Sequence, residues 1–152
     1  MTQNNCVVKI KKLTPDAHTP HYAHFGDSGA DLFATEDATL QPMERKAIGT
    51  GLTAEIPAGY ELQVRPKSGL ALKSGLTVLN TPGTIDFGYR GEIKVILINL
   101  SNKTYHVEKG QKIAQLVVAP VAYAEFEEVA ELSDTSRGGG GFGSTGLKRD
   151  CS

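Results

Sequence analysis

The chain has 152 residues, a length that suits one domain with a hydrophobic core of its own. Its 16 basic and 17 acidic residues leave a net charge of −1, which excludes an overall basic field that would recruit nucleic acid or an anionic membrane. No apolar run approaches the ~20 residues that span a bilayer, so we predict neither a nucleic acid nor a membrane as a partner.

The N-terminal region carries no targeting or metal signal. The first residues, MTQNNCVVKIKKL, lack a basic region followed by an apolar one, so we expect no signal peptide. Cys6 and Cys151 lie near opposite ends without metal-site spacing, and two isolated thiols are typical of the reducing cytoplasm. No cysteine supports His18, His21 and His24, and structural zinc needs four ligands, so we predict a solvated loop there.

The rest of the chain has the pattern of many short strands. Residues 60–65 alternate apolar and polar side chains, the period of a strand with one buried face, and 6–13 and 51–57 do so less regularly. Residues 93–100 are apolar on both faces, which predicts a central strand or one covered by another subunit as well as by its own sheet. Residues 112–122 form another buried run. Turn signals recur at intervals of roughly eight to twelve residues, which indicates an all-β sandwich or barrel.

Helical signal is scarce. Residues 68–76 allow one or two helical turns, and we expect 122–132 to form a last strand rather than a helix. A polar linker then precedes a glycine-rich run. We therefore predict a β domain over 1–132 and a linker with a mobile C-terminal arm over 133–152.

Two segments in the first half of the chain contain polar residues that could bind a ligand. Asp31 lies in an apolar stretch, GADLFA, and a carboxylate that faces inward must be paired or must serve a cation. In RPKSGLA, Lys67, Ser68 and Gly69 could present an ammonium, a hydroxyl and an amide to a phosphate. The alternative is a turn in which Ser68 caps a short helix.

Two further segments contain candidate groups. Residues 79–92, LNTPGTIDFGYRGE, read as a hairpin in which Asp86 lies between apolar residues, as a general base partly shielded from water would. Aspartate is also common in turns. Tyr89 could pack against a sugar or base, or be a surface aromatic. Gln115 lies in a buried run, so its amide needs hydrogen bonds from protein or ligand.

The run RGGGGFGSTG, residues 137–146, has two interpretations. It is a solvated tail, or it is a mobile arm whose bare backbone N–H groups surround an anion. Three glycines have G-x-G-x-x-G spacing, but too few residues follow for the helix of a dinucleotide fold, and a Walker lysine is absent. Any phosphate would then be held by amides, Arg137, Ser144 and Thr145, while Phe142 would stack on a flat ligand.

Together these segments carry a resemblance that none carries alone. In order they resemble the five motifs of the trimeric dUTP diphosphatases (dUTPases): GADLFA, RPKSGLA, NTPGTIDFGYRGE, GQKIAQLVV and RGGGGFGSTG. The resemblance implies a jelly-roll-like fold and a homotrimer whose active sites each draw on three subunits. It also implies Mg²⁺-assisted hydrolysis of dUTP to dUMP and pyrophosphate, which keeps uracil out of DNA and supplies dUMP for dTMP synthesis.

The resemblance also implies residue roles. Asp86 matches the residue that orients and deprotonates the water attacking the α-phosphorus, and Asp31 matches a carboxylate near the water shell of the metal. Tyr89 matches the ring that packs on deoxyribose, and Phe142 the ring that stacks on uracil when the arm closes. The remaining substrate-binding matches are Lys67, Ser68, Gly69, Gln115, Arg137, Gly143 and Ser144 for the phosphates, Asn80, Gly83, Thr84 and Ile85 for the uracil edge, and Lys94 for the nucleotide.

One position departs from the family pattern, and two alternatives stay open. Lys67 stands where the second motif usually has arginine, which keeps the charge but loses the bidentate fork. A dCTP deaminase-like enzyme would share the fold, but it usually lacks the glycine-rich arm. A non-catalytic nucleotide-binding regulator would not need Asp86 and the arm to be intact.

Overall fold

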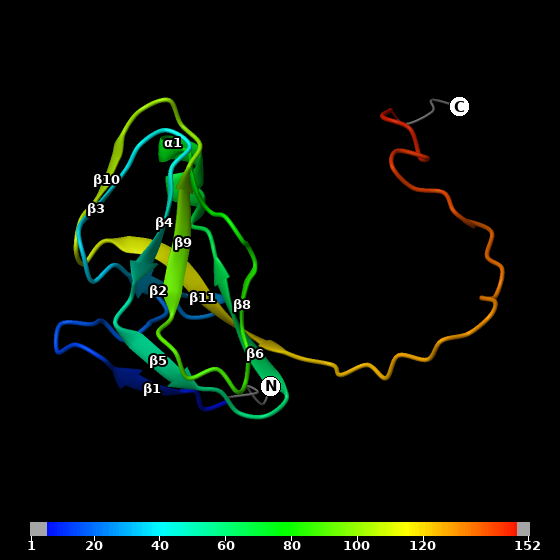
Figure 1. The fold of residues 1–152 in the computed structure, drawn as a ribbon, viewed down its shortest axis with the longest axis horizontal. Helices are drawn as coiled ribbons and strands as arrows, with labels where there is room; N and C mark the ends of the chain where they lie inside the picture. The colour runs from blue at the N-terminus through cyan, green and yellow to red at the C-terminus, as the bar shows by residue number, and fades with distance from the viewer. Residues whose placement is uncertain (1–5, 149–152) are drawn as a thin grey trace. The chain divides into compact units, whose positions relative to one another are not determined.

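A computed structural model describes residues 6–148 of the chain. The chain divides into two compact units, Met1–Ala122 and Tyr123–Ser152. Within the described residues, every strand and the single helix belong to the first unit (Figure 1). The strands are β1 (Lys9–Lys12), β2 (Gly29–Phe33), β3 (Ala38–Leu40), β4 (Arg45–Gly49), β5 (Leu52–Glu55), β6 (Tyr60–Arg65), β7 (Leu76–Val78), β8 (Gly83–Ile85), β9 (Lys94–Asn99), β10 (Tyr105–Val107) and β11 (Lys112–Pro120), and the helix is α1 (Ser68–Ser74).

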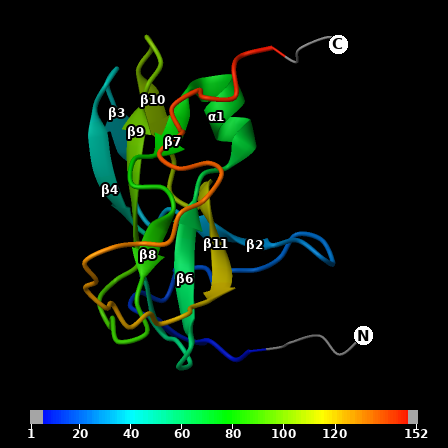
Figure 2. The same ribbon diagram turned by 90° about the vertical axis from the view of Figure 1, so that its right-hand side faces the viewer.

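Antiparallel sheets build the first unit. The largest has the strand order β2-β11-β6-β8, and Figure 2 shows these strands side by side. A second sheet has the order β4-β9-β7, and two pairs, β1-β5 and β10-β3, complete the set. The last strand, β11, pairs with both β2 and β6, so residues far apart in sequence meet on one sheet. The predicted all-β class is confirmed.

Alternating side chains of these strands form one hydrophobic core. In β6, Leu62 and Val64 are buried between partly exposed neighbours, as the alternation predicts. β9 is a central strand because β4 and β7 pair with its two edges, which confirms the prediction from its apolar run. The largest fully buried side chains are Leu32, Leu40, Ile48, Leu52, Ile56, Leu62, Leu76, Ile93, Leu97, Ile113, Val78 and Val95.

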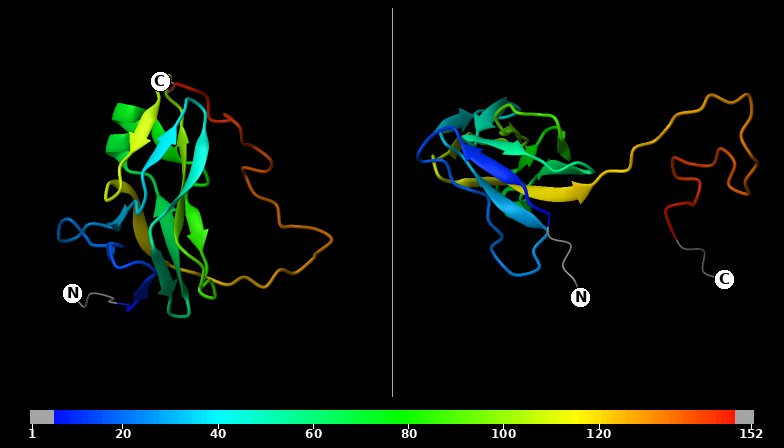
Figure 3. Two further views of the ribbon diagram at one scale, coloured as in Figure 1. Left: turned by 60° about the vertical axis from the view of Figure 1, so that its left-hand side comes forward. Right: turned by 90° about the horizontal axis from the view of Figure 1, so that it is seen from below.

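The helix α1 lies at one end of the strand bundle (Figure 3). It begins at Ser68 after Lys67, whose backbone is extended (φ −94°, ψ 125°). Gly75 ends it in the left-handed region (φ 66°), where a residue with a Cβ would be strained. Among the described residues, no helix is long and apolar enough to cross a membrane.

The predicted last strand over 122–132 is wrong. β11 ends at Pro120, and the following residues form neither strand nor helix. Phe126 is 95% exposed and Leu132 is 87% exposed. An alternating apolar segment forms a strand only beside a backbone that completes its hydrogen bonds, and the described single chain offers none here. The predicted boundary of the β domain at residue 132 stays a prediction.

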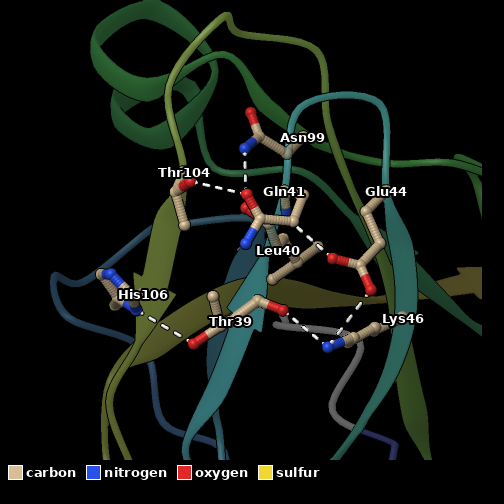
Figure 4. A network of polar contacts seen from close by, with 8 residues as sticks. All are labelled: Thr39, Leu40, Gln41, Glu44, Lys46, Asn99, Thr104 and His106. Carbon is tan, nitrogen blue, oxygen red and sulfur yellow. Dashed lines mark hydrogen bonds and ion pairs between the residues drawn. The ribbon is translucent and has the colours of Figure 1, made fainter.

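A polar network joins the ends of β3 and β9 to neighbouring loop residues (Figure 4). Asn99 is fully buried, and its amide nitrogen donates to the carbonyl oxygens of Leu40 (3.0 Å) and Lys103 (2.8 Å). Its side-chain oxygen accepts from the backbone nitrogen (3.0 Å) and the hydroxyl (2.8 Å) of Ser101. Nearby, the Thr104 hydroxyl donates to Gln41 Oε1 at 2.7 Å. The buried amide is therefore fully satisfied by groups that belong to the fold.

Candidate active site

The junction of β6 and α1 presents the predicted phosphate-binding segment. Lys67 is the N-cap residue and makes no side-chain capping hydrogen bond. The short helix of the alternative interpretation forms, but Ser68 is its first residue and not its cap. Ser68 and Gly69 are exposed, and a Cβ at Gly69 would meet nothing within 4 Å. This short segment is therefore open to a ligand.

Asp31 lies on β2 beside this junction and is only 5% exposed. Its Oδ1 is 2.5 Å from Lys67 Nζ, and its Oδ2 is 2.7 Å from Lys112 Nζ. Burial disfavours the charged form, but the hydrogen bonds and charges of Lys112 and Lys67 outweigh it and lower the pKa of Asp31 below 3.8. Of the two predicted roles, a paired carboxylate or one that serves a cation, the structure shows the pairing.

Gln115 brings the fourth motif to the same place. It lies opposite Asp31 on β11, and its Nε2 donates to the carbonyl oxygen of Pro66 at 2.8 Å. Its side chain passes directly over Gly29, because a Cβ there would lie 2.0 Å from Gln115 Oε1. The first, second and fourth motifs thus meet through the pairing of β2, β11 and β6.

The third motif forms the edge of the same sheet. β8 pairs with β6 on one side and ends the strand order, so part of its backbone is free to bind a planar ligand. Ile85 belongs to the hydrophobic core, which leaves only its backbone for such a contact. Asn80 and Thr84 are exposed and Gly83 is buried. Asp86 follows the strand with an exposed side chain, so within the described residues it is not shielded from water as predicted, because its apolar neighbour Phe87 is itself half exposed.

The register separates Asp86 from Lys67. Ile85 lies opposite Leu62, so Asp86 follows beside the start of β6, whereas Lys67 comes after its end at Arg65. At ~3.3 Å per residue, the positions opposite Asp86 and at Arg65 are about 13 Å apart along the strand. The proposed general base and the proposed phosphate-binding lysine of one chain therefore lie toward opposite ends of β6.

The hairpin that carries Asp86 is braced by backbone contacts. The Tyr89 hydroxyl donates to the carbonyl oxygen of Glu92 at 3.0 Å, which fixes the half-exposed ring. Glu92 Oε1 accepts from the backbone nitrogen of Gly51 at 3.0 Å, which ties the hairpin to the β4–β5 turn. Lys94 begins β9 in the other sheet, and its Nζ is 3.8 Å from Glu92 Oε2. Lys94 is thus associated with the hairpin and has no contact with Asp31.

The glycine-rich run forms a series of turns within the second unit. Arg137 Nε donates to the carbonyl oxygen of Gly140 at 2.9 Å, and Ser144 N donates to that of Gly141 at 3.1 Å. Phe142 has a left-handed backbone (φ 49°) and a fully exposed ring. Gly143 has φ 94°, a conformation that glycine adopts without strain.

The carboxylates and histidines near this segment suit a divalent cation that arrives bound to a ligand better than one held by the protein alone. Within residues 6–148, no group of three or more His, Cys, Asp or Glu side chains could hold a metal. His18 and His21 instead pack against Phe33, with ring centroids 4.9 Å and 6.1 Å away. Asp31 lies beside the predicted phosphate-binding segment with both oxygens held by lysines, which suits Mg²⁺ only as an ion that keeps its waters and binds mainly to phosphates.

Comparison with known proteins identifies the family. The dUTPase family model matches residues 15–146. The chain is 60% identical to the deoxyuridine 5'-triphosphate nucleotidohydrolase of Nautilia profundicola over 139 residues, which cover 91% of this chain and 98% of that protein. It is 58% identical to the protein of the same name from Clostridium tetani, with 91% and 96% covered. The chain belongs to the dUTPase family.

Solved dUTPase structures share the fold. The dUTPase of Staphylococcus bacteriophage 80alpha, solved with dUpNHpp, has a TM-score of 0.87 and 30% sequence identity, and the match covers 94% of this chain and 100% of that one. The dUTPase from phage phi11 of S. aureus has a TM-score of 0.79 and 26% identity, with 86% and 100% covered. A variant of that phage phi11 enzyme was solved for its coordination of a structural Mg(II) ion. The predicted jelly-roll-like dUTPase fold is confirmed.

One residue of the fourth motif, for which no role was predicted, lies at the candidate site. Lys112 contacts the buried carboxylate of Asp31. Between Lys112 and Ala114 the register of β11 against β2 shifts, and this bulge decides where the lysine points. A one-residue bulge cannot be detected from the sequence here, because the strand is apolar on both faces and shows no alternation for the bulge to interrupt.

Proposed function

We infer that this protein hydrolyses dUTP to dUMP and pyrophosphate, which keeps uracil out of DNA and supplies dUMP for dTMP synthesis. The observation that carries the inference is the likeness to deoxyuridine 5'-triphosphate nucleotidohydrolases over 91% of the chain, with all five motifs inside the matched region. The contacts among Asp31, Lys67 and Gln115 support it, because they gather three of those motifs at one site.

Phosphate recognition falls to the β6–α1 junction. Lys67, Ser68 and Gly69 contact the α- and β-phosphates, and the Gln115 amide adds a neutral donor. A triphosphate concentrates negative charge, and donors held in place before the reaction stabilise the charge that develops at the transition state. Mg²⁺ on the phosphates, with Asp31 near its water shell, would neutralise part of that charge and hold one conformation of the phosphate chain.

The hairpin recognises the nucleoside. The free backbone edge of β8, with Asn80, reads the hydrogen-bonding edge of uracil, and the hairpin excludes the methyl group of thymine. An incorrect base leaves a buried polar group unpaired, which is the costly outcome that gives selectivity. Tyr89 packs on deoxyribose and leaves no room for a 2′-hydroxyl. Its hydrogen bond to Glu92 supports this role, because it holds the ring in one orientation.

Asp86 is the general base. It accepts a proton from water as the water oxygen forms a bond to the α-phosphorus. The bond from that phosphorus to the bridging oxygen breaks, and pyrophosphate leaves with the electron pair. The exposed position of Asp86 directly after β8 supports this role, because the carboxylate is accessible to substrate and water.

The working enzyme is a homotrimer with shared sites. The register that separates Asp86 from Lys67 within one chain supports this, because a single dUTP reaches both groups more readily when they come from different subunits. The arm, with Arg137, Gly143 and Ser144 toward the phosphates and Phe142 on uracil, closes over a site of the trimer. Its glycines support a mobile arm, since they adopt several backbone conformations without strain. Lys94 completes the nucleotide contacts, and the enzyme acts in the cytoplasm.

The test is pyrophosphate release in the presence of Mg²⁺ from dUTP, UTP, dTTP and dCTP. Release from dUTP alone is expected, with a loss of at least about 100-fold in kcat for Asp86→Asn. A wild-type protein that binds dUTP without turning it over would instead be a regulator. Deamination of dCTP without pyrophosphate release would assign the protein to the deaminases that share its fold.

A further inference from the structure

A bulge in β11 aims Lys112 at the active site. Ile113 and Ala114 are neighbours in sequence, yet both lie in the hydrophobic core. In a regular strand, adjacent side chains point to opposite faces, so Lys112 and Gln115 would be separated by the sheet. The register shift between Lys112 and Ala114 cancels this alternation, and both Lys112 and Gln115 come to the face of Asp31.

The carboxylate of Asp31 thus has two cationic partners, one on each oxygen. Lys67 contacts Oδ1 and Lys112 contacts Oδ2, at 2.5 Å and 2.7 Å. Lys67 also belongs to the phosphate-binding segment, whereas Lys112 belongs to β11. The side chain of Asp31 is only 7% exposed, so a cation that leaves it is poorly replaced by water.

Lysine at position 67 creates a conflict that arginine would avoid. A guanidinium presents five donors in a planar fork and could contact a carboxylate and a phosphate together. An ammonium is a compact charge on a flexible stem. When Lys67 turns to the triphosphate, its contact with Asp31 weakens, and a buried carboxylate without a cation would oppose that movement.

We propose that Lys112 is a positioning residue, which holds Asp31 paired while Lys67 leaves it to bind the substrate phosphates. This inference rests on the proposed function. The side chain of Lys112 is 44% exposed, so the pair does not depend on deep burial of this lysine. Its ammonium also lies 6.0 Å from the ring centroid of Phe33, which limits where the side chain points.

The test is the affinity of the full-length protein for dUpNHpp, measured by calorimetry in EDTA and again with Mg²⁺. Lys112→Met is expected to raise Kd about tenfold in EDTA, the loss typical of one hydrogen bond to a charged group, and Lys112→Arg to restore it. KM should rise with Kd while kcat changes much less. The matched control is Lys109→Met, since Lys109 lies in the turn just before β11 but pairs with exposed Asp16. It should leave Kd unchanged.

Two further backgrounds separate positioning from direct contact. With Asp31→Asn there is no carboxylate to hold, so adding Lys112→Met should change Kd less than about twofold. In a Lys67→Arg background the guanidinium can contact Asp31 and the phosphates together, so the rise in Kd caused by Lys112→Met should also be smaller. An equal penalty in all backgrounds would mean that Lys112 contacts the nucleotide itself, and an unchanged Kd in a folded Lys112→Met protein would also overturn the proposal. Wild-type binding and turnover test the proposed function separately.

Discussion

Asn99 and Asp31 are both buried polar residues on strands, but they are satisfied in different ways. Asn99 bonds to backbone carbonyl oxygens and to Ser101, groups whose positions the fold determines. Asp31 is held by two lysine side chains that extend from other elements and are partly exposed. Neither residue lacks a partner, and no buried polar side-chain atom of the described residues does.

The difference teaches how to distinguish structure from function in a buried polar residue. A neutral amide paired with backbone groups gains nothing from movement, because any displacement leaves several buried groups unpaired. A flexible lysine that shares a carboxylate with a second lysine can turn to an anionic ligand at lower cost, because the carboxylate keeps one cation. The Asn99 network therefore belongs to the fold, whereas the Asp31 cluster has the mobility that the proposed site requires.

Asn99→Ala tests the structural half of this comparison and has the largest expected effect on stability. It removes the amide donor of the Leu40 and Lys103 carbonyl oxygens and the acceptor of Ser101, so the free energy of unfolding should fall by about 3 kcal/mol. Urea denaturation measures the loss. The specific activity of the protein that remains folded should be close to that of wild type, and a selective loss of kcat would break the distinction.

Gly29→Ala tests how tightly the site is packed and has an intermediate effect. The new Cβ would lie 2.0 Å from Gln115 Oε1, so the amide must leave its place over β2. We expect a loss of about 2 kcal/mol in the free energy of unfolding, as for other overpacked sites, and a higher KM for dUTP. Adding Gln115→Ala should recover stability without recovering activity. If the double variant is no more stable than Gly29→Ala, the clash lies elsewhere.

Asp31→Asn has the smallest effect on stability, about 1 kcal/mol at pH 7, because both lysines regain water. The pKa of Asp31 is lowered in the folded protein, so its contribution is present above the unfolded pKa of about 4 and is lost as the pH falls through the folded pKa. Urea titrations at several pH values should therefore show the Asp31→Asn difference shrinking below pH ~4. The Asn99→Ala difference should persist there.

A charged pair on the surface provides the control for that pH series. Lys109 hydrogen-bonds to Asp16 and lowers the pKa of this exposed carboxyl to about 2. Because solvent screens this pair, Asp16→Asn should change stability little, and the change should vanish in high salt. A salt-sensitive Asp31→Asn effect of the same size would show that the Asp31 cluster behaves as a surface pair.

Much of the fold could be predicted from the sequence, because local patterns of apolar and polar residues indicate individual strands. The alternation of residues 60–65 and the apolar run of 93–100 correctly predicted a half-buried strand and a central strand. The inward-facing Asp31 correctly predicted a paired carboxylate. The order of the five motifs predicted the dUTPase family, which the comparisons confirm.

The features that could not be predicted depend on contacts between segments that are distant in the sequence or on the detailed backbone conformation. The alternating segment 122–132 is not a strand, because a strand needs a neighbouring backbone as well as a pattern. The bulge at Ile113 is invisible because both faces of β11 are apolar there, so the orientation of Lys112 could not be predicted. Ser68 fits a helix cap equally well in sequence, and only the backbone shows that Lys67 occupies the cap.

The separation of Asp86 and Lys67 along β6 has a genetic consequence if sites are shared. A chain that lacks one of these groups would inactivate a site that it shares with a neighbouring subunit. Its other group could still complete a different site with a normal subunit. Two inactive proteins, Asp86→Asn and Lys67→Met, refolded together, would then regenerate some complete sites by complementation. In a cell that makes both a normal and a defective chain, defective chains would inactivate sites in mixed assemblies. Total activity would then fall by more than the fraction of chains that are defective.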